Sequence, residues 1–334
     1  MNKVRIGVLG CARINKAAVL DAAVEVPGLE VAAVASRDAA RAADYAARHG
    51  VARSYGAYEA LLADPDIDVV YNPLPNSLHA EWSIRALEAG KAVLCEKPLA
   101  SNADEAGRIV EAAGRAGRPL IEAFHYRHHP VAALILETVR SGALGRLTHM
   151  RAAMKVPGGL LAADDIRFQL ALAGGATMDL GAYGLNLMRW VAGAEPQVAE
   201  ARAELAAPDV DAAMHARLIF PGGLTGELDC ALAASEFEAG LTVEGERGRV
   251  HAVNPFLPQR GHSVTIETGG EPVVHRLDRT STYVFQARHL VEVVRDGATI
   301  RTPGEDGVAN MAAIDAVYRA AGLNPRGAPV ASPA

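Results

Sequence analysis

Three residues of this sequence could together carry acid–base chemistry: Lys97, Asp179 and Tyr183. Lys97 stands in a Glu-Lys-Pro turn that directly follows the apolar run Ala92–Cys95. Asp179 and Tyr183 are four residues apart, so on a helix they share one face and can present a carboxylate and a phenol to one substrate. An ammonium group stabilises an alkoxide, and either Lys97 or Tyr183 can deliver its proton. The alternative is structural: a solvated lysine, a buried tyrosine and an aspartate that caps a helix.

A glycine turn near the N-terminus could hold the phosphates of a dinucleotide. The apolar run Val4–Leu9 predicts a buried strand, Gly10 follows it, and Asn15–Val26 predicts a helix. Glycine lets the backbone approach a pyrophosphate, and the free amides at the helix start face the anion. Only Gly10 clearly fits the G-x-G-x-x-G frame, because Ala12 and Asn15 occupy the later positions, and a glycine that merely ends a strand is the alternative. The cofactor contacts expected from this turn are Gly10, Cys11, Ala12, Arg13 and Ile14.

The residues after the second predicted strand, Leu29–Ala35, indicate which dinucleotide is preferred. An NAD-dependent enzyme places Asp or Glu there to bind the ribose 2′-hydroxyl. This sequence has Ser36 and Arg37 instead. A hydroxyl and a guanidinium suit a 2′-phosphate, which a carboxylate would repel. The pair therefore favours NADP(H) over NAD, and a solvated surface arginine is the alternative.

Two further turns follow predicted strands. In a doubly wound sheet, ligands bind outside the carboxyl ends of the strands. The strand Val69–Asn72 ends in a proline-rich turn that could line a nicotinamide pocket, and the Glu-Lys-Pro turn places Lys97 over the same site. The cofactor contacts expected from these turns are Pro73, Leu74, Asn76, His79, Glu96, Lys97 and Pro98.

The order of the predicted elements indicates the fold class. Up to about residue 125 strands and helices alternate, which is typical of a parallel sheet covered on both faces. After about residue 145, Gly175–Ala192 predicts one long helix, consecutive short strands predict an antiparallel sheet, and two helices close the chain. We therefore predict an α/β protein. It has a Rossmann domain over residues 1–125 and an α+β domain over residues 126–334 with a large, mainly antiparallel, open-faced sheet. Its last helix could pack back on the first domain.

Composition excludes several classes of protein. Hydrophobic residues make up 50% and charged residues 22%, as in ordinary globular proteins. A net charge of −6 does not fit a nucleic-acid binder, and no apolar stretch is long enough for a transmembrane helix. Three cysteines without a CxxC pair, and an N-terminus without a signal-peptide pattern, favour a cytoplasmic location. The proline-rich tail, residues 324–334, is expected to be loose.

Other polar residues are weaker candidates. Arg167 precedes the long predicted helix and could hold a cofactor phosphate or a substrate oxygen, with a structural salt bridge as the alternative. His125, His128 and His129 look like a metal cluster, but no cysteine or paired carboxylate completes a ligand set, so we expect no metal. Tyr126 and His129 are interpreted as the wall of a substrate pocket.

In combination these motifs resemble the Gfo/Idh/MocA oxidoreductases, named for glucose–fructose oxidoreductase and inositol dehydrogenase. The resemblance covers essentially the whole chain. Its pieces are Gly7-x-x-Gly10-x-Ala12-x-Ile14, Ser36-Arg37, Pro73-Leu74-Pro75-Asn76-Ser77-Leu78-His79-Ala80, Glu96-Lys97-Pro98-Leu99 and the segment 174–183. Within the family the chain most resembles the branch of dihydrodiol dehydrogenases, D-xylose dehydrogenases and nucleotide-sugar 3-ketoreductases, whose style is seen in segments 122–130 and 165–168.

The resemblance implies a role for each matched residue. Lys97 would be the catalytic lysine beside the nicotinamide and the reacting oxygen, and Pro98 would follow a cis peptide bond that aims it. Asp179 and Tyr183 would face Lys97 from the second domain. Many members of the family carry a histidine where this chain has Tyr183, and in the branch just named a tyrosine takes its place, as it does here. Whether Lys97 or Tyr183 delivers the proton therefore stays open.

We predict an NADP(H)-dependent oxidoreductase that transfers hydride between nicotinamide and a sugar, nucleotide sugar or cyclic diol. Lys97, Tyr126, His129, Asp179 and Tyr183 are the expected substrate contacts. An aldose 1-dehydrogenase is the alternative within enzymes. A non-catalytic NADP-binding sensor is the alternative outside them, and the presence of all three acid–base residues argues against it. Pairing of the open sheet faces would hide apolar surface, so we expect a homo-oligomer, a dimer or a tetramer.

Overall fold

The computed structural model describes residues 3–327, which form two compact units. The first unit contains the described residues up to Ala100, Asp104–His128 and Thr280–Val308. The second unit contains Ser101–Ala103, His129–Arg279 and the described residues from Ala309 onward. The sequence led us to expect two domains that are each one continuous segment, divided after residue 125, whereas each unit of the structure is made of three segments. The segment Thr280–Val308 belongs to the first unit because its helix packs against that unit's sheet.

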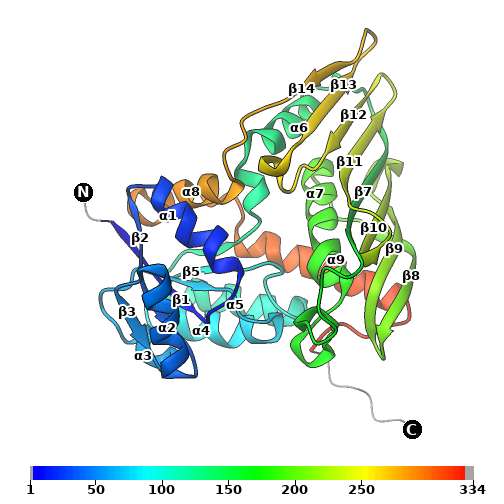
Figure 1. The fold of residues 1–334 in the computed structure, drawn as a ribbon. Helices are drawn as coiled ribbons and strands as arrows, with labels where there is room; N and C mark the ends of the chain where they lie inside the picture. The colour runs from blue at the N-terminus through cyan, green and yellow to red at the C-terminus, as the bar shows by residue number, and fades with distance from the viewer. Residues whose placement is uncertain (1–2, 328–334) are drawn as a thin grey trace. The chain divides into compact units, whose positions relative to one another are not determined.

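A parallel six-stranded sheet forms the first unit, in the order β3-β2-β1-β4-β5-β6 (Figure 1). This order is the predicted Rossmann arrangement. Every residue of β4 and β5 is buried, which explains why these strands are apolar along their whole length. The strands are β1 (Val4–Leu9), β2 (Leu29–Ala35), β3 (Arg53–Tyr55), β4 (Val69–Asn72), β5 (Ala92–Cys95) and β6 (Leu120–Glu122).

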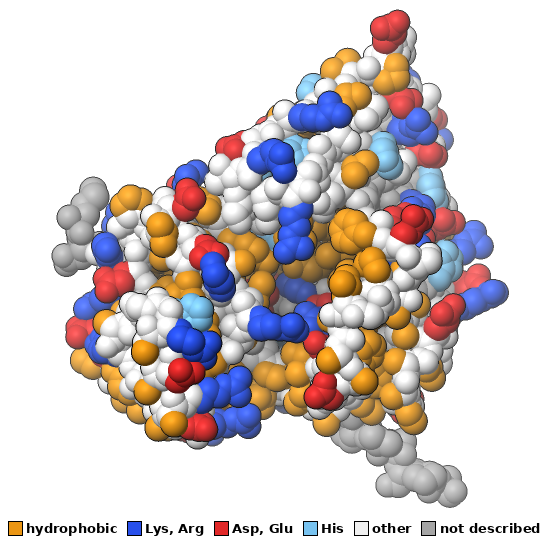
Figure 2. Space-filling model, in the orientation of Figure 1, with side chains coloured by type: hydrophobic (Ala, Val, Ile, Leu, Met, Phe, Trp, Pro, Cys, Tyr) orange, Lys and Arg blue, Asp and Glu red, His pale blue; other side chains and the backbone are white. Residues whose placement is uncertain are grey.

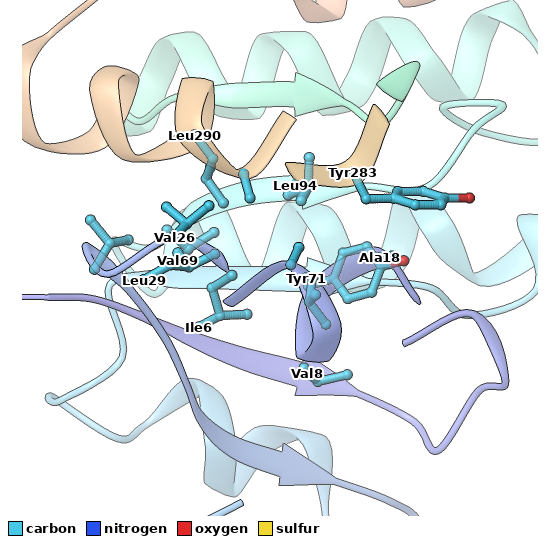
Figure 3. Close-up of a cluster of buried hydrophobic side chains, with 14 of the residues drawn as sticks. Ile6, Val8, Ala18, Val26, Leu29, Val69, Tyr71, Leu94, Tyr283 and Leu290 are labelled. Carbon is cyan, nitrogen blue, oxygen red and sulfur yellow. The ribbon is translucent and has the colours of Figure 1, made fainter. Parts of the chain in front are cut away.

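Helices cover both faces of this sheet. On one face, Leu290 of α8 points toward the strands, and Tyr283 of the same helix belongs to the same buried cluster (Figure 3). On the other face α3 approaches β1 closely, because a Cβ atom on Gly7 would lie 2.6 Å from the side chain of Leu61. The predicted helix Asn15–Val26 divides into a π-helical turn, Lys16–Leu20, and a short α-helix. The helices of this unit are α1 (Asp21–Glu25), α2 (Ala39–His49), α3 (Tyr58–Leu62), α4 (His79–Glu88), α5 (Ala103–Ala116) and α8 (Thr282–Asp296).

An eight-stranded sheet forms the second unit, in the order β14-β13-β12-β11-β7-β10-β9-β8. Neighbouring strands are antiparallel, as predicted, except for β7 and β10, which are parallel. The strands are β7 (Leu147–Pro157), β8 (Gln197–Ala207), β9 (Val210–Ile219), β10 (Thr225–Ala234), β11 (Glu238–Gly245), β12 (Gly248–Val253), β13 (Ser263–Glu267) and β14 (Val273–His275).

Helices α6 (Pro130–Arg140) and α7 (Ala182–Ala192) cover one face of the eight-stranded sheet. Helix α7 lies close to the strands because Gly184 lacks a side chain: a Cβ atom there would lie 2.5 Å from Leu228. The predicted helix Gly175–Ala192 is a π-helical turn, Thr177–Gly181, followed by α7. The last helix, α9 (Gly304–Ala320), contributes its first residues to the first unit and the rest to the second.

The other face of the eight-stranded sheet is polar. Arg151 forms ion pairs with Asp229 at 3.0 Å and with Glu238 at 2.6 Å. Figure 2 shows basic, acidic and histidine side chains interspersed over β8–β10, at its right-hand edge. Exposed apolar residues such as Ile219 and Val253 are scattered singly along the strands. This face therefore offers much less apolar surface for pairing between copies than the sequence pattern led us to expect.

The end of the described chain is anchored rather than loose. Arg326 is 1% exposed, and its guanidinium forms an ion pair with the fully buried Asp211 at 2.7 Å. The expectation of a loose tail is therefore wrong up to this residue, because a charged side chain ties it into the core of the second unit. The remainder of that tail, residues 328–334, lies outside the described residues.

The three cysteines, Cys11, Cys95 and Cys230, are all free thiols. Within residues 3–327 no helix combines the length and the apolar composition that crossing a membrane requires.

Candidate functional site

The carboxyl ends of four strands meet at one edge of the six-stranded sheet. In the parallel register Leu9 pairs with Ala35, and Asn72 pairs with Cys95. Strands β1 and β4 are also neighbours, so the two pairs adjoin. The turns that follow these strands begin at Gly10, Ser36, Pro73 and Glu96. The sheet thus brings the predicted cofactor turns together at the switch point between β1 and β4, where α/β sheets bind ligands.

Gly10 must be glycine for two reasons. Its φ is +79°, and a Cβ atom there would lie 3.0 Å from the side chain of Leu74. Its amide donates a hydrogen bond to the Ala35 carbonyl at 2.8 Å, which ties the turn to the end of β2. Asn15 is fully buried, and its side-chain amide donates to the Gly10 carbonyl at 2.9 Å. The asparagine at the third glycine position of the frame therefore braces the turn.

The rest of this turn presents small or partly exposed side chains. Cys11, Ala12 and Ile14 are half-buried, and Arg13 is exposed. Cys11 and Ile14 pack against the apolar cluster of the first unit. The segment therefore offers mainly its backbone to a ligand, as a phosphate-binding turn must.

The end of β2 is rich in positive charge. Ser36 is buried, and its hydroxyl accepts a hydrogen bond from the Asp38 amide at 3.3 Å, while the adjacent Arg37 is exposed. The Asp38 carboxylate is already engaged, because it caps α2 by accepting hydrogen bonds from the amides of Ala40 and Arg41. No carboxylate therefore stands in the position that selects a ribose 2′-hydroxyl.

Tyr58 and Arg41 extend this region beyond the predicted residues. Burial raises the pKa of Tyr58, while the nearby Arg37 and Arg41 guanidinium groups oppose the shift. The Tyr58 hydroxyl lies 3.7 Å from the position that a Cβ atom on Gly10 would take. Tyr58 thus links the glycine turn to Arg37. Sequence reasoning missed both residues because they lie on ordinary amphipathic helices without a motif.

Asn72 and His79 hold the proline-rich turn after β4. The side-chain amide of Asn72 donates to the His79 carbonyl at 3.2 Å and to the Ser83 hydroxyl at 3.0 Å. The Nδ1 atom of His79 lies 2.9 Å from the Pro98 carbonyl, and Nε2 lies 2.8 Å from the Leu74 carbonyl. His79 is 1% exposed, so its imidazole joins the turn after β4 to the turn after β5. Its contact with a cofactor stays a prediction.

The Glu-Lys-Pro turn is built on buried partners. The peptide bond before Pro98 is cis, which confirms the expectation. Glu96 accepts a hydrogen bond from the buried Tyr71 hydroxyl at 2.7 Å and from the Lys97 amide at 3.4 Å. Tyr71 fixes the residue before Lys97 from the neighbouring strand. The sequence offered no signal for this role, because Tyr71 lies inside an apolar run.

Two buried imidazoles lie near Lys97. Burial lowers the pKa of His79 to about 4, and the Lys97 charge acts in the same direction. Burial, together with Lys97, lowers the pKa of His125 to about 3. The ring of His125 packs against Tyr283 of α8, with the centroids 4.2 Å apart. Both histidines are therefore neutral around the predicted catalytic lysine at physiological pH.

These two histidines predict an acid-sensitive first unit. Below pH ~6.5 an unfolded chain protonates His79 and His125. The folded chain does so only near pH 4 and pH 3. Stability is therefore complete above pH ~6.5 and falls as the pH decreases toward 4. We expect the thermal unfolding midpoint of His125→Phe to depend less on pH, between about 7 and 5, than that of wild type. His251→Phe, at an exposed site, should match the wild-type dependence, and an equally steep curve for His125→Phe would contradict the assignment.

In the second unit, Asp179 lies in the π-helical turn and is held by Arg167. The guanidinium Nε donates to the Asp179 carboxylate at 2.6 Å, and Nη1 donates to Asp165 at 3.0 Å. The Asp179 carboxylate is the main cause of the raised pKa of Arg167, which stays charged. The salt-bridge alternative for Arg167 is therefore realised in the structure, and its contact with a cofactor phosphate stays a prediction.

Tyr183 lies on the first turn of α7. It is 7% exposed, and its ring packs against Phe256 with the centroids 5.4 Å apart. The residue four positions earlier, Asp179, precedes the change from π-helix to α-helix at Gly181. A Cβ atom on Gly181 would lie 3.1 Å from the Cys230 sulfur, so the sheet is close behind this turn. Local π-helical turns of this kind often occur at functional sites.

Tyr126 and His129 are fully buried. Tyr126 packs edge-to-face against Phe124, with the centroids 6.0 Å apart. The His129 Nδ1 atom accepts a hydrogen bond from the Val131 amide and caps α6. Each therefore has a structural role, and substrate contact by either stays a prediction. Among residues 3–327 no group of three or more His, Cys, Asp or Glu side chains is arranged to hold a metal ion.

Comparisons with known proteins follow the same two-part division. Residues 4–124 match the Gfo/Idh/MocA model described as an oxidoreductase family with an NAD-binding Rossmann fold. Residues 133–251 match the Gfo/Idh/MocA C-terminal domain.

Individual relatives match nearly the whole chain. The D-xylose 1-dehydrogenase (NADP(+)) 2 of Haloferax volcanii is 37% identical over 94% of this chain and 96% of the relative. A dTDP-3,4-didehydro-2,6-dideoxy-alpha-D-glucose 3-reductase of Saccharopolyspora spinosa is 36% identical over 82% of each chain. The structure of a 3-ketoreductase from Actinomadura kijaniata with NADP and TDP-benzene superposes with a TM-score of 0.87 and 31% identity, covering 96% of this chain and 98% of that one. On the strength of these matches, and of the Rossmann sheet with its glycine and Glu-Lys-Pro turns, the chain belongs to the Gfo/Idh/MocA family of oxidoreductases.

Proposed function

We propose that this protein is an NADP(H)-dependent oxidoreductase that transfers hydride between nicotinamide and a carbon of a sugar, nucleotide sugar or cyclic diol. The observation that carries the proposal is the meeting of three turns at one sheet edge. These are the positive-φ turn at Gly10, the Ser36-Arg37 pair and the turn that bears Lys97. The relatives support it, since they are named as an NADP-linked xylose dehydrogenase and as nucleotide-sugar ketoreductases.

The residues at this edge fit NADP(H). The backbone at Gly10 would admit the pyrophosphate, because no side chain stands there. Ser36 and Arg37 would hold the 2′-phosphate, with Arg41 and Tyr58 beside them. The turn after β4 would border the nicotinamide, braced by His79. Bound NADP(H) supplies or accepts the hydride, and the chain supplies orientation and proton handling.

The chain's own residues would then divide the work. The Lys97 ammonium stabilises negative charge on the substrate oxygen, and Lys97 or Tyr183 takes or gives the proton. Arg167 positions Asp179 through a 2.6 Å ion pair. We further propose that Lys97, Asp179 and Tyr183 all contact the same substrate molecule.

Arg37→Ala tests the cofactor preference. Loss of a charge-assisted contact to the 2′-phosphate should weaken NADPH binding ~10-fold or more and leave NADH binding within ~2-fold. Fluorescence titration with each cofactor measures both dissociation constants. Arg48→Ala, which removes an exposed arginine of α2, is the matched control and should change neither. A wild-type protein that prefers NADH would contradict the assignment.

The substrate class is tested by a screen for NADP⁺ reduction. The panel contains aldoses, inositols and trans-diols, and the reverse assay offers keto-sugars and keto-nucleotide sugars with NADPH. Turnover of aldoses alone would favour the aldose 1-dehydrogenase alternative. NADPH binding without turnover of any compound would favour the sensor and would contradict the proposal.

Two expectations from the sequence stay predictions. The three free thiols are compatible with a cytoplasmic location. A homo-oligomer, a dimer or a tetramer, would use the open face of the eight-stranded sheet, where charge pairs such as Arg151 with Glu238 would meet the partner copy. Light scattering at micromolar concentration measures the oligomeric state, and a monomer would contradict this prediction.

A further inference from the structure

A buried charge cluster lies beneath the turn that carries Asp179. Arg326 and Asp211 have side-chain exposures of 1% and 0%, and their charged atoms are 2.7 Å apart. The other carboxylate oxygen of Asp211 accepts hydrogen bonds from both the amide and the hydroxyl of Thr177, each at 2.7 Å. The Tyr318 hydroxyl donates to Asp211 at 2.9 Å. Buried charges are tolerated only when their hydrogen-bonding capacity is met, and this pair meets that condition.

The cluster fixes the start of the helical segment that carries Asp179 and Tyr183. Asp211 acts as an N-terminal cap supplied from a distant strand, because it binds the amide of the first residue of the π-helical turn, Thr177. The Arg326 Nε atom donates to the Gly174 carbonyl at 2.8 Å. The amide of Asp179 in turn donates to the Gly175 carbonyl at 3.1 Å. A short chain of contacts therefore leads from Arg326 to Asp179.

Gly174 and Gly175 are closely packed on both sides, so this chain of contacts is rigid. A Cβ atom on Gly174 would lie 2.5 Å from the Arg167 carbonyl oxygen. A Cβ atom on Gly175 would lie 2.1 Å from the Asp211 carboxylate and 2.6 Å from the Tyr318 hydroxyl. The backbone is thus held between the Arg167 loop on one side and the buried cluster on the other. A shift of the cluster must move the segment that holds Asp179.

We infer that Arg326 is a positioning residue for the reaction: through Asp211 and Gly174 it sets where Asp179 and Tyr183 stand. The inference rests on the proposed function and extends it to the C-terminal segment of the chain. That segment is itself tied down, because the Asn102 side chain donates to the Arg326 carbonyl at 2.7 Å. Arg326 touches no candidate substrate group, so its effect must appear in the rate of chemistry rather than in cofactor binding.

Arg326→Met tests the inference. The thioether fills similar space but cannot bind Gly174 or Asp211, so we expect kcat to fall by on the order of 10-fold to 100-fold. The NADPH dissociation constant should not change. The primary deuterium isotope effect on kcat should be at least as large as in wild type, because hydride transfer becomes the slow step. The assays are run at a temperature where near-ultraviolet circular dichroism shows the variant to be as folded as wild type.

Lys91→Met is the matched control. Lys91 is a buried cation of the first unit, directly before the amino end of β5, where its ammonium donates to the carbonyls of Asp64 at 2.6 Å and Ile67 at 2.9 Å. This variant should lower stability without lowering kcat or changing the isotope effect of the folded enzyme. An equal loss of kcat in both variants would show general destabilisation and overturn the inference. Unchanged kcat in folded Arg326→Met would overturn it as well.

Milder variants keep the test decisive if Arg326→Met does not fold. Tyr318→Phe removes one hydrogen bond to Asp211 and should lower kcat several-fold with NADPH binding intact. Deletion of residues 326–334 should reproduce the Arg326→Met result, whereas deletion of 328–334 keeps every contact named above and should not. Wild-type kcat in folded Tyr318→Phe and in the longer deletion would contradict the inference. A wild-type protein without turnover would instead contradict the proposed function.

Discussion

Replacement of Lys97 by methionine is expected to lower kcat/KM by ~1000-fold or more while NADPH binding stays within a few-fold of wild type. Methionine retains the length of the side chain but removes the charge that would stabilise the substrate oxygen, together with a proton carrier. The turn itself should survive, because Tyr71, Glu96 and the His79–Pro98 contact hold it through other atoms. Steady-state kinetics on the best substrate of the screen, with fluorescence titration of NADPH, measures both quantities.

Lys16→Met is the control for this experiment. Lys16 is an exposed lysine of the first unit whose partner is Asp21 at 2.7 Å, and its loss should leave kcat/KM unchanged. Tyr183→Phe, measured alongside, separates the two proton carriers: the larger fall in kcat identifies the residue that moves the proton. Near-wild-type turnover by Lys97→Met would remove Lys97 from the chemistry.

Gly175→Ala is expected to lower the free energy of unfolding by about 3–5 kcal/mol, as when a buried ion pair is broken. The glycine has φ +135°, and the new methyl group would lie 2.1 Å from the Asp211 carboxylate. Either the backbone or the Asp211–Arg326 pair must move, and both are fully packed. The thermal unfolding midpoint should fall by on the order of 10 °C. Calorimetry or circular dichroism measures it.

Gly261→Ala separates backbone strain from crowding. Gly261 also has positive φ, +109°, but no atom within 4 Å of the added Cβ. It should show only the cost of holding alanine at this positive φ, ~1–3 kcal/mol, without the added cost of crowding. Equal losses of stability in the two variants would mean that the buried cluster tolerates the methyl group. The rigidity argued for the segment beneath Asp179 would then be wrong.

The Rossmann part of the fold could be predicted because its signals are local. The strands Val4–Leu9, Val69–Asn72 and Ala92–Cys95 have the predicted bounds, since buried parallel strands appear as continuous apolar runs. Strand β7, in the middle of the second sheet, mixes apolar residues with His149, Arg151 and Lys155, so it has no continuous apolar run and gave no such signal. Its outward positions carry Arg151 and Lys155. These two side chains form ion pairs with acidic residues of β10 and β11.

The candidate site was predictable where a motif marks it and not where tertiary contacts build it. Gly10, Ser36-Arg37 and Lys97 stand in recognisable turns. Tyr71 lies within an apolar run, and Arg326 lies in a proline-rich tail. The surrounding sequence therefore does not indicate which residue either of them contacts. The π-helical turn around Asp179 likewise depends on a cap from Asp211, which lies 34 residues beyond Thr177 in the chain.

Transfer of deuterium is the most direct test of the central claim, that hydride passes between NADP and a sugar carbon at a site built around Lys97. The wild-type protein and NADP⁺ are mixed with a sugar substrate that is deuterated at the reacting carbon. The mass of the reduced cofactor is then measured by mass spectrometry. The keto-sugar direction is tested in the same way with deuterated NADPH. We expect one deuterium in the product with wild type and none over the same time with Lys97→Met. Reduced cofactor without deuterium, or equal transfer by Lys97→Met, would contradict the claim.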